Sequence, residues 1–395
     1  MHVRRATLRN FRNFEHLTLD FGPRFTVLHG HNGAGKTNVL EALYLVSTLR
    51  SFRSSELGPL VRHDHPVATV ELEGLDPEVD LETRLAVHLE RTSTSTRRTA
   101  IADGKTVRSG AAFYGRVRAV LFTPEDLAVL RGGPSGRRQF LDRVLFARDR
   151  AHISDIQAYE KLLRSRNHVL KRDDLSSTQR ADLLETYEAG LAEVGSRVWN
   201  RREQLLHAIA DLFEKAFERI HGHLGASPRS EVAPRAPARL RYAARFGEAA
   251  PHERLHALKE ALRAGRPEDM RRKTTGVGPH RDDLSVELDG QPAGQFASQG
   301  QSRALVLAFK LAELKLAALE GPRSPLLLLD DVSSELDPRR SAMLFEALTA
   351  DIGQCVLTTT DASYVTLPAG IEARWWKVEQ GRIYGSEAPA GAPAP

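Results

Sequence analysis

The sequence predicts an α/β protein with a head built from both ends of the chain and a mostly helical second lobe. Two observations support this fold class. A strand, a glycine-rich turn and a helix follow one another within residues 25–49, and strand and helix signals return after Gly276. Between these regions, residues 151–223 lack proline and interleave charged residues with Leu and Ile, which is typical of long helices.

The order of these signals predicts how the chain is divided. Alternating polar and apolar runs over residues 3–28 and 67–101 indicate strands and hairpins. The helical lobe should contain two or three long helices, with breaks near residues 173–177 and at Gly195. An Ala-, Pro- and Gly-rich end indicates a disordered tail. The expected segments are 1–150 (first part of the head), 151–270 (helical lobe), 271–385 (second part of the head) and 386–395 (tail).

Composition narrows the class of protein. Cys355 is the only cysteine, so an internal disulfide is excluded and a reducing, cytoplasmic compartment is expected. Arginines scattered through residues 1–14 leave no apolar stretch for a signal peptide. Charged residues interrupt the most apolar helix, residues 305–319, so we expect no membrane span. The formal net charge of +5 favours a polyanionic partner such as nucleic acid, although an arginine-rich solvated surface explains it equally well.

A glycine-rich stretch after the strand at residues 25–29 matches the phosphate-binding pattern G-x-x-x-x-G-K-[ST]. Its glycines let successive backbone N–H groups point at a phosphate, and its lysine adds a positive charge. The threonine hydroxyl would bind Mg²⁺, and the N-terminus of the following helix favours an anion. The flanking strand and helix favour ATP or GTP binding over a decorative turn. The candidate residues are Gly30, His31, Asn32, Gly33, Ala34, Gly35, Lys36 and Thr37.

Four consecutive leucines at residues 326–329 run directly into Asp330 and Asp331. A buried parallel strand that delivers a carboxylate to its carboxyl end has this pattern. Asp330 would hold Mg²⁺ and Asp331 would orient or deprotonate the attacking water, which makes both, with Lys36, candidate catalytic residues. Alone, the pattern fits a core strand followed by a solvated acidic turn; beside the glycine loop, a nucleotide site is the better interpretation. Residues 334–337 would begin the next helix or contact a neighbouring subunit.

Ser298 and Gln301 have the spacing of a capping box at the start of the strongest helix, residues 302–319. The spacing alone indicates only a helix N-terminus. Gly300 lies between them, and the free N–H groups of such an end also favour an anion. A right-handed crossover to the leucine strand would open this end on the ligand-binding edge of the sheet.

The order of these features resembles ABC-type ATPases: a phosphate loop, a Ser-x-Gly-Gln segment, and a leucine strand that ends in Asp-Asp. The helical insertion is similar to the chromosome-maintenance and recombination branch of that class rather than to transporter subunits. Residues 8–14, 124–142 and 276–283 resemble the RecF family. The resemblance covers nearly the whole chain apart from the tail, and it implies a P-loop ABC-type ATPase head.

That resemblance also implies ligands and partners. It implies ATP and Mg²⁺, a homodimer that forms on ATP, slow hydrolysis as a release step, and binding to single-stranded or gapped DNA. RecR and RecO would be partners in loading RecA recombinase. The resemblance places two residues near the nucleotide and three that would cap the nucleotide of the other subunit: Arg12 and Asn13, and Ser298, Gly300 and Gln301.

The sequence departs from the broader ABC pattern in three places. Gln299 replaces the first glycine of the common signature, and Asp331 stands where glutamate is more usual. The shorter side chain of Asp331 would place a water less well, so slow turnover is expected. Residues 358–360 are threonines where a switch histidine would be expected, and no residue clearly matches the glutamine loop.

Basic clusters are the candidates for DNA contact, through the phosphate backbone rather than the bases because little aromatic sequence is interleaved. An arginine-covered solvated surface explains most of them. The clusters are residues 137–138, 164–172, 201–202 and 271–273.

Other functions share part of these features. An ABC transporter-type subunit would not normally carry so long a helical insertion, and a small-molecule kinase has no use for the Ser298 segment. An ATP-gated dimerisation module without significant turnover uses the same site, and only the consequence of hydrolysis distinguishes it.

Overall fold

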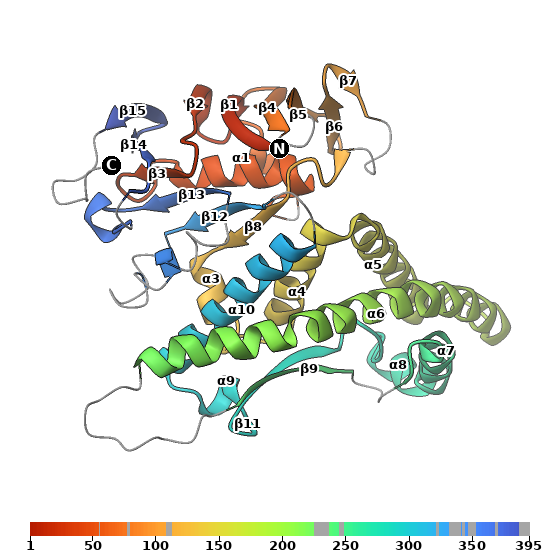
Figure 1. Ribbon diagram of the computed structural model, residues 1–395. Helices are drawn as coiled ribbons and strands as arrows, with labels where there is room; N and C mark the ends of the chain where they lie inside the picture. Colours follow the sequence, from red (N-terminus) through yellow and green to blue (C-terminus); the bar gives the residue numbers. More distant parts are fainter. Residues whose placement is uncertain are drawn as a thin grey trace. The chain divides into compact units, whose positions relative to one another are not determined.

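The computed structural model describes all of the chain except residues 55, 77–79, 108–112, 225–236, 245–248, 321–323, 332–340, 342–343, 347–352, 368–369 and 387–395. The chain divides into two compact units (Figure 1). The first contains Met1–Leu127, Lys215–Pro228 and Arg303–Pro395, and the second contains Ala128–Glu214 and Arg229–Ser302.

A largely parallel sheet forms the base of the first unit, and this confirms the predicted α/β class. Its six described strands lie in the order β15-β14-β3-β13-β12-β8, and only β15 is antiparallel to its neighbour. Because Leu329 is level with Phe122 and Asp330 with Thr358, the carboxyl ends of β8, β12 and β13 meet at one edge. The strands are β3 (Phe25–His29), β8 (Ala119–Phe122), β12 (Leu326–Asp330), β13 (Gln354–Thr359), β14 (Ala373–Glu379) and β15 (Arg382–Ser386).

An antiparallel sheet forms the second layer of this unit, in the order β2-β1-β4-β5-β6-β7. Its strands alternate buried and exposed residues, because one face packs on the core and the other faces solvent. The short helix η1 (Gly58–Leu60) lies between β3 and β4 in the chain. The strands are β1 (His2–Phe11), β2 (Phe14–Asp20), β4 (Val67–Asp76), β5 (Leu81–Arg91), β6 (Thr96–Ala102) and β7 (Lys105–Thr106).

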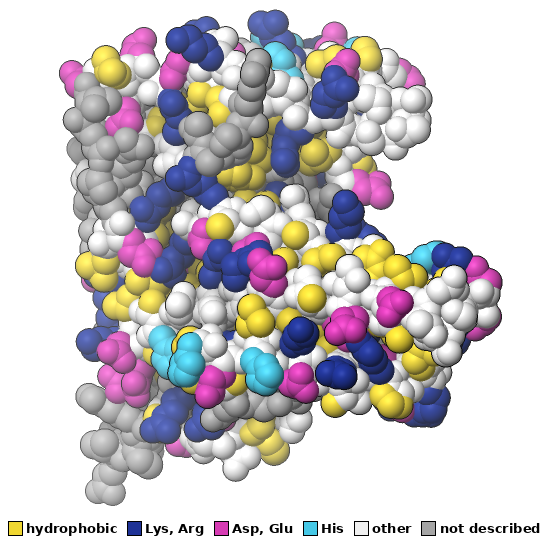
Figure 2. Space-filling view, turned by 90° about the vertical axis from the view of Figure 1, so that its right-hand side faces the viewer, with side chains coloured by type: hydrophobic (Ala, Val, Ile, Leu, Met, Phe, Trp, Pro, Cys, Tyr) yellow, Lys and Arg dark blue, Asp and Glu magenta, His cyan; other side chains and the backbone are white. Residues whose placement is uncertain are grey.

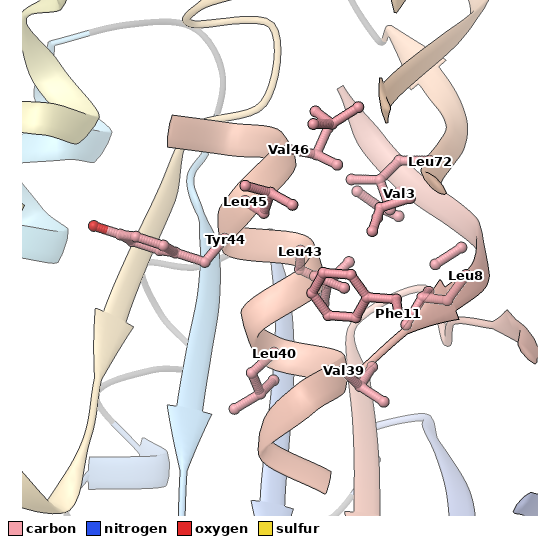
Figure 3. Close-up of a cluster of buried hydrophobic side chains, with 14 of the residues drawn as sticks. Val3, Leu8, Phe11, Val39, Leu40, Leu43, Tyr44, Leu45, Val46 and Leu72 are labelled. Atoms are coloured by element: carbon pink, nitrogen blue, oxygen red, sulfur yellow. The ribbon is translucent and has the colours of Figure 1, made fainter. Parts of the chain in front are cut away.

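Helix α1 (Lys36–Thr48) fills the core between the two sheets. In Figure 3, Leu43 points toward Phe11 and Val46 points toward Leu72 of the antiparallel sheet. Leu328 of β12 belongs to the same buried cluster. Since this helix begins directly after the glycine loop, packing on both sheets holds the loop in place.

Helices dominate the second unit, together with a small sheet in the order β11-β10-β9. The predicted break at 173–177 is confirmed, because α5 ends at Lys171 and α6 begins at Ser177. The predicted break at Gly195 is wrong, because α6 is continuous over 48 residues. A Cβ at Gly195 would lie 2.7 Å from Leu258 and 3.1 Å from Tyr159, so close helix packing explains this glycine.

The remaining helices and strands of both units follow β8 in the chain. None of the helices in the described parts of the chain is long and apolar enough to cross a membrane. The bounds are α3 (Pro124–Ala128), α4 (Pro134–Arg148), α5 (Arg150–Lys171), α6 (Ser177–Leu224), β9 (Ala238–Ala243), α7 (Arg254–Ala264), α8 (Arg266–Arg272), β10 (Asp283–Leu288), β11 (Gln291–Pro292), α9 (Ala293–Phe296), α10 (Gln299–Leu319) and, near the end of the chain, η2 (Ala362–Tyr364).

The compact units differ from the predicted segments 1–150, 151–270 and 271–385. The second unit begins at Ala128 and extends to Ser302, because α4 packs on β10. Ser386, the first residue of the predicted tail, ends β15, and the rest of that tail lies outside the described residues. The division into functional domains stays a prediction.

A buried ion pair between Asp142 of α4 and Arg202 of α6 fastens the second unit. Two hydrogen bonds of 2.9 and 2.8 Å join them, and Arg202 also donates to the carbonyl of Pro279 at 2.7 Å. Nearby, the hydroxyl of Tyr159 and Nδ1 of His280 lie 2.8 Å apart. Burial lowers the pKa of His280 to about 4, so this imidazole is neutral near pH 7. These hydrogen bonds tie Pro279 and His280 to α6 and α5 within this unit.

Replacing Asp142 with asparagine should lower the free energy of unfolding by about 3 kcal/mol, because Arg202 would keep its buried charge without a carboxylate. The control is Asp149→Asn, since Asp149 pairs with Arg201 but its side chain is 40% exposed. That control should cost less than about 1 kcal/mol. Urea unfolding measures both, and equal losses would contradict the prediction.

The difference between wild type and Asp142→Asn should also depend on pH. Burial opposes ionisation of Asp142, yet Arg202 and His152 hold the pKa of its carboxyl well below the usual range. A carboxyl whose pKa is lowered by folding contributes its stability above the unfolded pKa and loses it as pH falls through the folded pKa. The difference should therefore shrink between about pH 5 and pH 1.

Candidate functional site

The glycine loop between β3 and α1 has a backbone that only glycine adopts readily. Gly30, Gly33 and Gly35 have φ angles of 146°, 81° and 114°. Close neighbours add a second constraint at two of them. A Cβ on Gly30 would lie 2.3 Å from the carbonyl oxygen of Val378, and one on Gly35 would lie 2.5 Å from Nδ2 of Asn13. The loop is therefore held against β14 and the β1–β2 turn.

Lys36 closes this loop with its own side chain. Its ammonium donates hydrogen bonds to the carbonyls of Gly30 at 2.6 Å and His31 at 3.0 Å. Burial lowers the pKa of the Lys36 ammonium, and the carboxylates of Asp331 and Asp330 oppose that shift. A positive charge with little access to water is thus held near the loop and near β12. Because β12 runs into Asp330 and Asp331, we call it the acid strand.

The structure brings the glycine loop and the acid strand together. The hydroxyl of Thr37 donates to Oδ1 of Asp330 at 2.8 Å, and the hydroxyl of Thr358 donates to the same oxygen at 2.8 Å. Burial raises the pKa of the Asp330 carboxyl, and these two hydrogen bonds oppose the shift. The predicted Mg²⁺ ligands, Thr37 and Asp330, are therefore adjacent.

Asp331 turns away from the strand with a φ of 48°, a left-handed conformation that aspartate tolerates better than most residues. Its backbone N–H donates to the hydroxyl of Thr358 at 2.9 Å and to the carbonyl of Thr358 at 3.1 Å. Thr358 therefore fixes both acidic residues. The sequence prediction missed this role because it treated residues 358–360 only as the place of a missing histidine.

Glu125 is a second residue that the sequence prediction missed. It follows β8 in the first turn of α3, and its side chain is exposed. Its charge, with that of Asp331, contributes to the raised pKa of Asp330. The signal was available: an apolar strand at residues 119–122 is followed by Thr-Pro-Glu, and carboxyl ends of parallel strands meet at one edge.

Asn13 supports the loop directly, whereas Arg12 is engaged elsewhere. Asn13 donates to the carbonyl of Ala34 at 3.1 Å and accepts a hydrogen bond from Asn38 at 2.7 Å. Arg12 makes two hydrogen bonds of 2.7 Å to the fully buried carboxylate of Glu41. Both residues line a cavity of about 410 Å³ beside the loop, with Asn38, Arg53, Pro59, Val61, His63 and Arg91.

The predicted capping box is present in the second unit. The backbone N–H of Ser298 donates to Oε1 of Gln301 at 2.9 Å, and the N–H of Gln301 donates to the hydroxyl of Ser298 at 3.1 Å. Helix α10 begins at Gln299, three residues before the predicted start at 302, so Gly300 lies in its first turn. Residues 334–337, predicted to contact a neighbouring subunit or begin a helix, lie outside the described residues.

This geometry defines a class of protein. A parallel sheet, a glycine loop before a buried helix, and an acid strand bonded to the threonine of that loop form a P-loop ABC-type head. Residues 2–369 match the family described as RecF/RecN/SMC N terminal domain. A solved structure described as the SmcHead bound to the C-winged helix domain of ScpA shares the fold, with a TM-score of 0.53, 14% identity and 98% of both chains covered.

The chain belongs to the RecF family. It is 39% identical over 384 residues to the DNA replication and repair protein RecF of Anaeromyxobacter sp. (strain Fw109-5), which covers 97% of this chain and 99% of that one. The RecF of Myxococcus xanthus (strain DK1622) is 39% identical over 380 residues, or 95% of each chain. A solved structure described as the recombination mediator protein RecF-ATP in the RecFOR pathway has a TM-score of 0.81 and 27% identity over 98% of both chains.

Gly30→Ala should disrupt the loop far more than Gly33→Ala. The added methyl at Gly30 would meet a backbone oxygen, whereas nothing lies within 4 Å of a Cβ at Gly33. We expect Gly30→Ala to lower the free energy of unfolding by about 2 kcal/mol or more, and Gly33→Ala by about 1 kcal/mol for the left-handed backbone alone. Thermal and urea unfolding measure both, and equal effects would contradict this account of the loop.

Proposed function

We propose that this chain is an ATP-binding, ATP-hydrolysing DNA-repair protein whose dimerisation is controlled by nucleotide. The observation that carries the proposal is the 2.8 Å hydrogen bond between Thr37 and Asp330, which places a hydroxyl and a carboxylate beside a glycine loop. Magnesium is commonly held by one or two such protein oxygens together with substrate phosphates. The residues present therefore fit ATP with Mg²⁺.

Within this proposal, each part of the loop has a role. Backbone N–H groups of the glycine loop and the N-terminus of α1 would receive the phosphates, since no side chain caps α1 in the described structure. Lys36 would exchange its carbonyl partners for phosphate oxygens. Thr37 and Asp330 would hold Mg²⁺, which neutralises charge on the terminal phosphates when bound.

Asp331 is the proposed residue for water. Thr358 fixes its backbone at the carboxyl end of the parallel strands. From there its carboxylate could orient a water molecule or accept a proton from it. An aspartate reaches less far than a glutamate from the same backbone position. Slow turnover is the expected consequence, and hydrolysis would then time release rather than drive work.

Dimerisation is proposed to complete the site. Ser298, Gly300 and Gln301 lie at a helix N-terminus, whose backbone N–H groups suit an anion. We propose that this segment of one subunit caps the nucleotide of the other. Asn13, which bonds to the loop, and Arg12 beside it line the cavity that is the candidate for the rest of the nucleotide.

The partners are proposed from the relatives. Curated relatives carry the description DNA replication and repair protein RecF, and solved relatives belong to the RecFOR pathway. We propose that this chain binds single-stranded or gapped DNA and works with RecR and RecO in loading RecA recombinase, in the cytoplasm. An ATP-gated dimerisation module without significant turnover is the second candidate, and Asp331 in place of glutamate favours it.

Lys36→Met should abolish ATP-dependent dimerisation, because it removes the buried positive charge at the phosphates while keeping an apolar stem of similar length. The matched control is Lys377→Met, since Lys377 lies on β14 beside β3 but is 48% exposed and paired with Glu379. Light scattering with and without ATP and Mg²⁺ measures the dimer. Wild-type dimerisation of Lys36→Met would refute a nucleotide site at this loop.

Asp331→Asn should lower ATP hydrolysis by about 100-fold or more, the lower range for loss of a general base, with ATP affinity nearly unchanged. The ATP-bound dimer should then persist longer on DNA. Asp20→Asn is the control, since Asp20 pairs with Arg5 in the same unit and its side chain is 40% exposed. Dimer lifetimes come from dissociation of labelled DNA. An unchanged lifetime despite lost hydrolysis would favour the dimerisation module.

A further inference from the structure

Most of the predicted basic clusters are engaged in ion pairs inside the second unit. Arg202 pairs with Asp142, Arg137 pairs with Asp283, and Lys273 pairs with Asp173. In Figure 2, basic and acidic side chains alternate over much of the face that is shown. A count of arginines and lysines therefore overstates the positive charge available to a polyanion.

Helix α5 is the exception among these clusters. Lys161, Arg164, His168 and Lys171 are exposed and follow one another at spacings of three, four and three residues, so they share one side of the helix. We call these four residues the α5 basic face. At about 1.5 Å per residue it extends roughly 15 Å along the helix axis. In the described structure its three lysine and arginine side chains have no ion pair or hydrogen bond with another residue.

On the opposite side of α5, by contrast, the arginine is buried and paired with carboxylates. Arg166 is fully buried and is held by Glu188 at 3.0 Å and Asp269 at 2.7 Å. Tyr159 and Leu170, on the same side as Arg166, are buried as well. Arg164 and Arg166 are thus only two residues apart on one helix. Arg166 is neutralised inside the unit, whereas Arg164 is exposed to solvent.

The carboxylates next to the α5 basic face in the sequence are few, and two of them are paired with other residues. Glu160 flanks it and is exposed. Beyond the end of the helix, Asp173 is paired with Lys273, and Asp174 is paired with Arg172. Within residues 160–171 of α5, Glu160 is therefore the only carboxylate, whereas Lys161, Arg164 and Lys171 are three exposed positive charges.

We propose that the α5 basic face binds the phosphate backbone of DNA. The inference rests on the proposed DNA-repair function and names the surface that would carry it. Lys161, Arg164 and Lys171 are spaced by about 5 and 10 Å along the helix axis, which complements the closely spaced phosphates of a nucleic acid strand. The only aromatic residue of α5 besides histidine, Tyr159, is buried, so this face offers no base stacking. Contact would be to the backbone and independent of base sequence.

The test is a triple variant, Lys161→Gln/Arg164→Gln/Lys171→Gln, in the full-length protein. Binding to a fluorescent gapped duplex is measured by anisotropy with ATP and Mg²⁺ at several salt concentrations. At about 0.1 M salt, affinity should fall tenfold or more, and the salt slope of the logarithmic affinity should decrease by about 2 to 3. ATP-dependent dimerisation and thermal stability should stay unchanged, because the three side chains are exposed.

The matched control is Arg239→Gln/Lys259→Gln/Arg263→Gln, which removes three exposed cations of the same unit that likewise lack ion pairs among the described residues. It should retain most of the affinity. Restoring charge with Arg164→Lys, in place of Arg164→Gln, should recover part of the binding.

The possible outcomes distinguish the inference about α5 from the proposed function. If the wild type binds DNA and the α5 triple variant binds equally well, the inference is overturned and the proposed function stands. Equal losses in the triple variant and its control would show an effect of net charge alone, which also overturns it. If the wild type binds no DNA with ATP and Mg²⁺, the proposed DNA-repair function itself fails.

Discussion

The site depends on the order of strands in the parallel sheet. β13 lies between β3, which leads into the glycine loop, and β12, which ends in Asp330. A residue at the end of β13 must therefore lie between the glycine loop and the acid strand. Thr358 occupies that place with a side chain short enough to donate to Asp330 and accept from the N–H of Asp331. The contact between Thr37 and Asp330, 293 residues apart in sequence, follows from this order.

A buried charged group ties a helix to the same edge of the sheet. Lys310 of α10 donates to the carbonyl of Leu121 at 2.8 Å and to Glu313 at 2.9 Å, and it lies 3.7 Å from Asp126. Asp126 accepts a hydrogen bond from the N–H of Thr123 at the end of β8. A shift of α10 along its axis would have to break these contacts or carry the end of β8, and hence Glu125, with it.

Local patterns were enough to predict the fold class, the glycine loop and the acid strand, because each is a contiguous run with its own period or turn chemistry. Thr358 and Glu125 were missed because their importance depends on strand order, which no local pattern reveals. Gly195 was misjudged for a related reason: its signal is the same for a helix break and for close packing. Arg166 was within reach of sequence reasoning, since it recurs at helical spacing with Tyr159 and Leu170 on the buried side of α5.

Burial acts on the two halves of the candidate site with opposite signs. It lowers the pKa of the Lys36 ammonium and raises that of the Asp330 carboxyl, so each group holds its charge less readily than in water. A phosphate alone would favour the charged Lys36 but would set a second anion beside Asp330. A divalent cation alone would favour ionised Asp330 but would repel Lys36. A ligand that brings phosphate and cation together would relieve both shifts, which agrees with the magnesium–nucleotide complex proposed for this site.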